Sequence, residues 1–478
     1  MKTKYSLIIF GIGTIVLHLL SFNFFPINYE FTFSEGSKFF DLFEKKYSDF
    51  YFQNQANTIF YSLIINLIDR ITLDFFDNLM IARLISFTSY IFLIYGLLYN
   101  FRLFRIKKTL YSLIIIFFLF NPIIWILSFR SSPDLISFSL GFYSSSLLLY
   151  KYKNIFIKKI SLILLGISIT LKPFACIYLL YLIIFIDGKP SIKILKKYFI
   201  DFIILIIIPI TYYVSVKYHF GFYLLSDSFY SDHAIKKNLL NILQNLVGYM
   251  CFLSIFIFPL SLSLQIKLNY KIFLSYIFLI FFGVYQFNFF ELGELDFGFF
   301  GLYLNNNILL IISFSLLFFF FLKILEIIKH KEEIKINIKL ITVIIFFLIM
   351  LSLSKPVQRY LIFILPIIIF LIIKNSEVKK IKLLLIIGIC IYLPINLMSF
   401  LNFYSKSKFY NQIFLILKSN DIEKVTDFKT LDHTLGFLYL DNKSEKKFYI
   451  AREPRNYFLK FEDKFFGLKR IYYLNYLN

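Results

Sequence analysis

The sequence predicts an all-α polytopic membrane protein of about thirteen transmembrane helices, followed by a small external α/β domain. Composition is the first reason, because 59% of the 478 residues are apolar and only 17% are charged. A soluble domain is about 45–50% apolar and about 25% charged. The second reason is a series of long apolar runs, and the third is the clustering of basic residues in alternate loops. The same composition excludes a disordered chain.

The apolar runs follow one another in chain order, most of them close to the ~20 residues that cross a bilayer as a helix. The first follows Lys2 and Lys4 and has no small-residue cleavage site, so we expect an uncleaved anchor. Only Lys172–Pro173 separates the short fifth and sixth runs. The predicted spans are approximately 5–26, 80–100, 109–129, 133–150, 159–171, 173–187, 198–217, 239–265, 272–290, 306–328, 338–353, 357–373 and 383–401.

Charge decides the role of the shorter apolar stretch 57–68. If this stretch crossed the membrane, the basic loop near 102–108 would face outward, whereas short basic loops stay cytoplasmic. We therefore expect 57–68 to be an amphipathic helix at the membrane surface, within a long first external loop over 27–79. The cytoplasmic N-terminus and loops then hold 25 basic and 5 acidic residues. The predicted topology is a multi-pass integral membrane protein with the N-terminus inside and the C-terminus outside.

This topology divides the chain into a transmembrane domain over 1–402 and a small extracytoplasmic domain over 403–478. The tail begins with a helix-like stretch, 409–424, and two strand-like runs follow, 436–440 and 447–451. The formal net charge of +22 belongs mostly to the cytoplasmic loops. No nucleic-acid partner is expected, because no basic soluble domain gathers this charge.

The sequence contains no phosphate-binding glycine-rich loop and no zinc-ligand spacing, and its cysteines, Cys176, Cys251 and Cys390, lie in apolar runs. The sequence therefore requires no cofactor, and it leaves the need for a divalent metal open. The middles of the predicted helices carry almost no ionisable residues, unlike those of ion-coupled transporters. Charged residues gather instead at the predicted outer helix ends: Arg83, Arg130, Asp134, Lys172, Lys355 and Arg359. Carboxylates and cations at the outer interface favour a site for general base chemistry on a substrate with an anionic head group.

Several segments resemble GT-C membrane glycosyltransferases. The opening of that family is similar to three segments of this chain, Phe33–Gly36, Tyr51–Leu67 and Met80–Ser86. Further similarities are the Arg-x-x-Pro-Asp turn of Arg130–Asp134, the Gly166–Phe174 helix end and the Arg-Tyr pair in Lys355–Tyr360. Helix number, orientation and the external tail resemble the subgroup of protein O-mannosyltransferases and the lipid A aminoarabinose transferase.

The resemblance implies a reaction on the extracytoplasmic face of a membrane, which we expect to be a bacterial inner (plasma) membrane. A polyprenyl-phosphate-linked donor would transfer its sugar, with inversion, to a lipid, glycan or protein acceptor. Glu35 would be the base that deprotonates the acceptor, with Asp41 and Asp49 as reserves. Cations beside the donor phosphate would be Lys355, Arg359 and Arg83. Supporting roles would fall to Arg130, Asp134, Lys172 and His233.

Other interpretations of these residues stay open. Glu35 is equally a solvated loop carboxylate, Lys355 and Arg359 are interfacial anchors by snorkelling, and Arg130 with Asp134 is a structural ion pair at a helix start. A lipid-linked glycan polymerase or ligase is the alternative enzyme class. A lipid or sugar transporter is the non-enzyme alternative, and it predicts pseudo-symmetric halves with polar residues at mid-depth.

Overall fold

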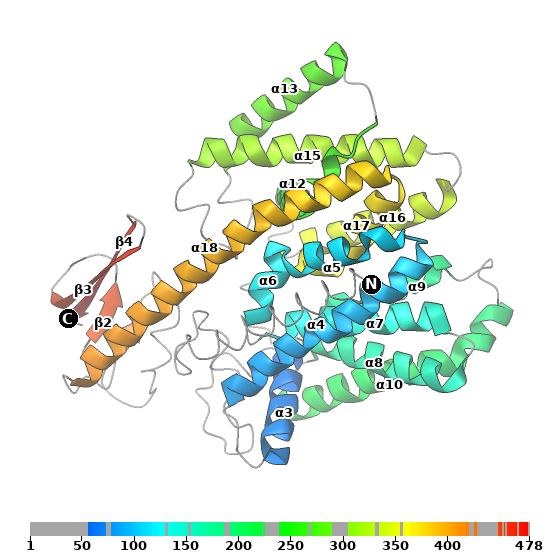
Figure 1. Cartoon of the computed structure of the whole chain (residues 1–478). Helices are drawn as coiled ribbons and strands as arrows, with labels where there is room; N and C mark the ends of the chain where they lie inside the picture. The colour runs from blue at the N-terminus through cyan, green and yellow to red at the C-terminus, as the bar shows by residue number, and fades with distance from the viewer. Residues whose placement is uncertain are drawn as a thin grey trace.

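The computed structural model is a mainly helical bundle with a small β-sheet standing away from it (Figure 1). It describes residues 56–72, 78–129, 132–151, 154–185, 192–221, 223–224, 239–265, 269–288, 305–329, 334–353, 357–419, 425–427, 448–451, 454, 457–465 and 468–476. The predicted first span, 5–26, and most of the predicted first external loop lie outside these residues.

The helices coincide with the predicted apolar runs along the described chain. The first half contains α3 (Ala56–Ile71), α4 (Asn78–Leu103), η2 (Lys108–Leu110), α5 (Tyr111–Leu119), α6 (Pro122–Phe129), α7 (Pro133–Lys151), α8 (Ile155–Leu171), η3 (Pro173–Cys176), α9 (Ile177–Phe185) and α10 (Ile192–Phe220). The second half contains α12 (Leu239–Ile257), η4 (Leu260–Leu262), α13 (Tyr270–Gln286), α15 (Asn306–Lys329), α16 (Ile334–Ser352), η7 (Gln358–Phe363), α17 (Leu365–Lys374) and α18 (Val378–Ser419).

Five helices of the described chain are long and apolar enough to cross a membrane: Ile81–Leu103, Phe199–His219, Leu239–Ile257, Asn306–Lys329 and Val378–Leu401. Residues 108–128 make a sixth if the two halves of this bent pair form one span. The predicted fold class of a mainly α-helical integral membrane protein is therefore confirmed. The number of thirteen spans stays a prediction, because several of the other apolar helices are shorter than a bilayer crossing requires.

Two predicted spans are broken, and proline accounts for both breaks. The run 109–129 bends by 60° between α5 and α6, where Asn121 precedes Pro122. Proline disfavours helical backbone at the residue before it and cannot donate a backbone hydrogen bond. The run 357–373 divides into the 3₁₀-helix η7 and the α-helix α17, which has Pro366 in its first turn.

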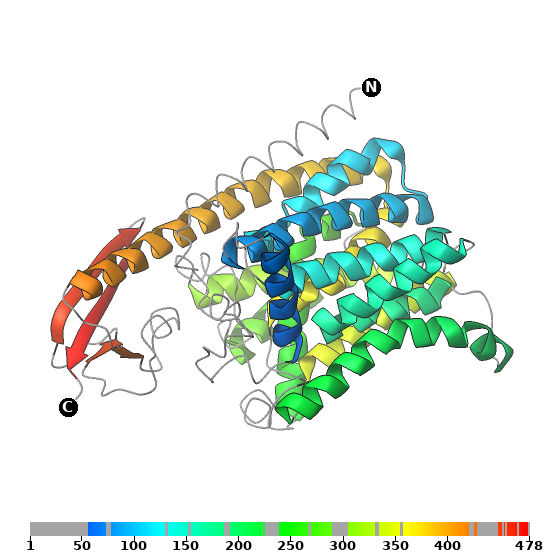
Figure 2. The same cartoon turned by 90° about the horizontal axis from the view of Figure 1, so that it is seen from below.

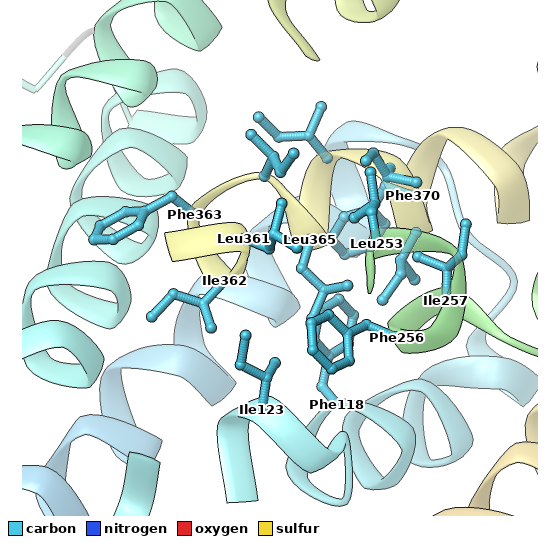
Figure 3. Packing of buried hydrophobic residues seen from close by; sticks show 14 of the residues in the cluster. Phe118, Ile123, Leu253, Phe256, Ile257, Leu361, Ile362, Phe363, Leu365 and Phe370 are labelled. Atoms are coloured by element: carbon cyan, nitrogen blue, oxygen red, sulfur yellow. The ribbon is translucent and has the colours of Figure 1, made fainter. Parts of the chain in front are cut away.

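The core of the bundle surrounds η7 and α17. Every residue from Leu365 to Ile373 is buried, so α17 has no face left for lipid or water. A helix that is apolar on all sides belongs in the centre of a packed structure. Figure 3 shows side chains of η7 and α17 meeting α12, α5 and α6; the labelled residues are Phe118, Ile123, Leu253, Phe256, Ile257, Leu361, Ile362, Phe363, Leu365 and Phe370.

The outer helices α10 and α13 each carry more exposed large apolar side chains than any other described helix. On α13, Phe278, Phe281 and Tyr285 are each more than 70% exposed. Gly283 is the one buried residue of this helix. Gly283 permits a close approach, since a Cβ atom there would lie 2.5 Å from the ring of Phe314 on α15. Such surfaces are unfavourable in water and suit contact with lipid chains.

Helix α3 lies across the bundle instead of along it (Figure 2). Its apolar side packs on one end of α4, α7 and α8 through Tyr61 and Ile65, which contact Ile81, Ile136 and Leu171. The Tyr61 hydroxyl donates to the carbonyl of Ala82 at 3.2 Å. A separate helix is thus present over the predicted stretch 57–68, and its place at the membrane surface stays a prediction.

Helix α18 is continuous over 42 residues and carries the β-sheet at its far end (Figure 1). The predicted domain boundary at residue 402 therefore falls within one helix. The strands are β1 (Val425–Asp427), β2 (Phe448–Ala451), β3 (Tyr457–Phe465) and β4 (Leu468–Tyr476), in the order β1-β2-β4-β3. Strands β1 and β2 are parallel, and the other two pairs are antiparallel. Phe409 of α18 stacks on Tyr472, with ring centroids 5.8 Å apart.

The predicted strand 447–451 corresponds to β2, whereas the predicted strand 436–440 lies outside the described residues. The long hairpin is instead β3–β4, which sequence analysis did not identify. The predicted helix 409–424 is the end of α18, and it ends at Ser419 in the described structure.

A buried polar network joins the ends of α15 and α17 to the segment after η4. Lys323 is fully buried, and its ammonium group donates to Glu326 Oε1 at 2.6 Å and to the carbonyls of Ser263 at 3.0 Å and Asn375 at 3.2 Å. The other carboxylate oxygen of Glu326 accepts the Gln265 N–H at 2.7 Å. All three protons of the ammonium group thus have an acceptor, as a buried charge requires.

Candidate functional site

The structure describes four of the predicted site residues: Arg83, Asp134, Lys172 and Arg359. The others lie outside the described residues, namely Glu35, Asp41, Asp49, Arg130, His233 and Lys355. The site is therefore built here from Asp134 and the side chains that converge on it.

Asp134 lies in the first turn of α7, at a helix start formed by local sequence. Pro133 is the first helical residue, where its missing N–H costs nothing. Ser132 precedes it, and the Ser132 hydroxyl accepts the Asp134 N–H at 3.3 Å and donates to Asp134 Oδ2 at 2.5 Å. A carboxylate in the first turn is also favoured by the helix dipole. The segment therefore fixes a buried carboxylate at the start of α7.

Two cations from distant parts of the chain meet this carboxylate. Lys172 Nζ lies 3.2 Å from Asp134 Oδ1, and Arg359 Nε lies 3.4 Å from Asp134 Oδ2. The side chains of Asp134 and Lys172 are 2% and 9% exposed, whereas that of Arg359 is 24% exposed. Arg359 is therefore the member of this trio that can reach a ligand most directly. The predicted Arg130–Asp134 pair lies partly outside the described residues, and the ion pairs described for Asp134 are with the other two cations.

An aromatic side chain completes the cluster. Lys172 Nζ lies 4.9 Å from the ring centroid of Tyr360, and Arg359 Cζ lies 5.6 Å from it. Phe174 packs on the same ring, with centroids 4.3 Å apart. Cations over an aromatic face gain electrostatic stabilisation, which increases when water is excluded. The ring of Tyr360 therefore contacts both cations, and Phe174 packs against the same ring.

A reciprocal serine pair sets the register of α7 against α8. The Ser137 hydroxyl donates to the Ser168 carbonyl at 2.8 Å, and the Ser168 hydroxyl donates to the Ser137 carbonyl at 2.7 Å. Ser137 is about one turn after Asp134, and Ser168 is about one turn before Lys172. The pair therefore aligns the two helix ends so that the carboxylate and the ammonium group meet. Gly141 allows this approach, because a Cβ there would lie 2.6 Å from Ser168 Oγ.

Helix α12 positions the segment before Arg359. The Asn245 amide donates to the Ser352 carbonyl at 3.1 Å, and the Tyr249 hydroxyl accepts the Val357 N–H at 2.8 Å. Both α12 side chains are buried. These bonds fix Ser352 and Val357, which flank the segment that contains Lys355. The start of η7, where Arg359 lies, is therefore anchored to α12.

Arg83 is buried near the start of α4, on the part of that helix covered by α3. Its neighbour Ala82 receives the hydrogen bond from Tyr61. Arg83 therefore lies at the end of α4 that packs against α3, the start of α7 and the end of α8.

Chemically, the trio of Asp134, Lys172 and Arg359 carries one negative and two positive charges. Charge-assisted bonds from Arg and Lys are the strong bonds that proteins use for phosphate. A partly exposed guanidinium oriented by a buried carboxylate is therefore suited to bind an anion. Among the described residues, no group of three or more His, Cys, Asp and Glu side chains could hold a metal ion.

Sequence reasoning missed Ser137, Ser168, Tyr249 and Gln358. The serines had a signal, because small polar residues recur in the α7 segment, and such residues mark close helix contacts in membranes. Tyr249 and Gln358 had none, since Tyr249 lies inside an apolar helix and a single polar residue at a helix start, such as Gln358, is common.

Comparison of the chain with protein-family models, curated proteins and solved structures finds no match. The resemblance to GT-C enzymes therefore stays a prediction based on the segments quoted above.

Proposed function

We propose that this chain is a glycosyltransferase of the GT-C type. It would transfer a sugar, with inversion, from a polyprenyl-phosphate-linked donor to a lipid, glycan or protein acceptor on the extracytoplasmic face of a membrane. The observation that supports the proposal best is the convergence of Lys172 and Arg359 on Asp134, beside Tyr360. Three segments that resemble GT-C motifs supply these residues, and α3 covers the same end of α4, α7 and α8.

In the proposed reaction, the acceptor hydroxyl oxygen attacks the anomeric carbon of the donor sugar. The bond from that carbon to the phosphate oxygen breaks, and the electron pair leaves with the phosphate. Arg359 and Lys355 would stabilise this growing charge, with Lys172 behind them. Asp134 is held by Ser132 and by both cations, so its role would be to orient them. The proton of the acceptor would pass to Glu35, with Asp41 and Asp49 as alternative bases.

The first experiment measures binding of undecaprenyl phosphate to the full chain in nanodiscs. Arg359→Gln should weaken binding by about 10–100-fold, because a charge-assisted contact to phosphate is lost. Arg102→Gln is the matched control. Arg102 also lies over a tyrosine ring, that of Tyr150 at 5.2 Å, but it is in the last turn of α4, far from the site along that helix. Equal losses in the two variants would reject a phosphate site at Arg359.

The second experiment follows release of undecaprenyl phosphate from donors carrying glucose, mannose or aminoarabinose. Glu35→Gln should abolish release without changing donor binding. Release without Glu35 would move the base to Asp41 or Asp49. The same assay separates the alternatives, because a polymerase would extend its lipid-linked product repeatedly. A transporter would move the donor without any release.

A further inference from the structure

The side chain of Gln358 is a polar group that the protein itself leaves unbonded. It is 1% exposed, and neither its amide oxygen nor its amide nitrogen has a hydrogen-bond partner among the described residues. Buried polar groups in folded proteins are nearly always hydrogen-bonded, and each exception requires an explanation. An amide with both ends unbonded destabilises the fold, because it has lost water without gaining a partner.

Hydrogen bonds fix the backbone on both sides of Gln358. The Val357 N–H donates to Tyr249, and the Tyr360 N–H donates to the Val357 carbonyl at 3.3 Å. Gln358 is the first residue of η7, which packs against α6, α7 and α12. The amide is thus held inside the bundle, one residue away from Arg359.

We propose that Gln358 binds hydroxyl groups of the donor sugar, beside the phosphate held by Arg359. This inference rests on the proposed function and names the part of the donor that the cationic trio does not recognise. The sugar is bonded directly to the phosphate, so the two must occupy adjacent positions. Gln358 directly precedes Arg359, with Cα atoms about 3.8 Å apart, so its amide is the nearest unbonded polar group along the chain to the proposed phosphate position.

The chemistry of the amide fits a sugar and not an anion. A glutamine side chain offers two donors and an acceptor with two lone pairs, whereas Arg and Lys only donate. Sugar hydroxyls both donate and accept, and vicinal pairs can engage both ends of one amide. Binding of the sugar ring would give hydrogen-bond partners to both amide atoms. The free energy lost by the unbonded amide would then be recovered only with the glycosylated lipid, and the site would select that lipid over the bare phosphate.

The test compares undecaprenyl phosphate with its glucose, mannose and aminoarabinose forms, using the full chain in nanodiscs. The wild type should bind at least one glycosylated form about tenfold more tightly than the bare phosphate, the value of one or two hydrogen bonds. Gln358→Leu should abolish this preference and leave binding of the bare phosphate within about twofold. Arg359→Gln should weaken both, because it acts on the phosphate.

Gln358→Met keeps the length of the side chain and serves as the second variant if the leucine variant folds poorly. Both should melt at a higher temperature than the wild type, since a buried unbonded amide is removed. A preference for the glycosylated lipid that survives in the Met or Leu variant would overturn the inference while leaving the phosphate site intact. A wild type that binds no polyprenyl phosphate would overturn this inference and the proposed function together.

Discussion

The Lys323–Glu326 pair allows a stability prediction that does not depend on any assigned function. Lys323→Met keeps most of the stem volume but leaves the Glu326 carboxylate buried without its counter-charge. Removing one partner of a buried pair costs about 3–5 kcal/mol, so we expect about 4 kcal/mol here. Glu326→Gln keeps an acceptor for the Gln265 N–H and leaves the ammonium group with two carbonyls. Its cost should be smaller, about 3 kcal/mol.

The double variant is the decisive measurement. It contains no buried charge, and its main defect is the loss of a donor for the carbonyls of Ser263 and Asn375. Its total cost should therefore be about 4 kcal/mol instead of the sum of about 7, which gives a coupling of about 3 kcal/mol. SDS unfolding in mixed micelles measures it, because the single tryptophan, Trp125, is buried and stacks on Phe120. Additive losses of about 7 kcal/mol would refute the assignment of an ion pair.

Three further predictions concern helix register, sheet stability and helix spacing. Ser168→Ala should lower the free energy of unfolding by about 1 kcal/mol, and Ser275→Ala, which loses only an exposed bond to its own helix, should change it far less; equal effects would argue against the serine pair. Lys460 and Lys469 lower the pKa of Glu462 to about 2, below the ~4.3 of an unfolded chain. The stabilisation of β3 and β4 should thus be complete above pH ~4.3 and be lost as the pH falls toward ~2. Hydrogen exchange of the full chain should show this loss, and Glu462→Gln should remove the pH dependence; a wild-type pH profile in the Gln variant would contradict it. Gly166→Ala should destabilise by about 2 kcal/mol in SDS unfolding, because its Cβ would lie 2.6 Å from the Leu205 carbonyl oxygen; an unchanged stability would mean that α8 and α10 separate without cost.

Much of the helical architecture was predictable because apolar runs and basic loops are governed by the bilayer. Charge alone separated the stretch 57–68 from the predicted spans, and the structure has the separate helix α3 lying crosswise there. The bend at Asn121–Pro122 also had a sequence signal, since the residue before proline leaves the helical region. The central place of α17 had none, because a run of uniformly apolar residues does not reveal whether lipid or protein surrounds it.

The members of the candidate site were predictable one by one, but their partners were not. Asp134, Lys172 and Arg359 were conspicuous as charges at the ends of apolar runs. Their meeting depends on the packing of α7, α8 and η7, and this packing rests on contacts such as the Ser137–Ser168 pair that carry no charge signal. Long-range pairing of this kind follows from the tertiary fold and not from local sequence.

Because α18 is continuous, the position of the β-sheet depends on the number of residues in this helix. The helix leaves the candidate span at Leu401, and the sheet packs against it at Phe409, about 12 Å further along the helix axis. Each residue inserted between these two positions would raise the sheet by about 1.5 Å and turn it by about 100° about the helix axis. Insertions of three or four residues would leave it about 60° or 40° from its original direction, whereas an insertion of two would turn it by about 200°. The length of α18 therefore sets both the distance of the tail domain along the helix axis and its direction around that axis.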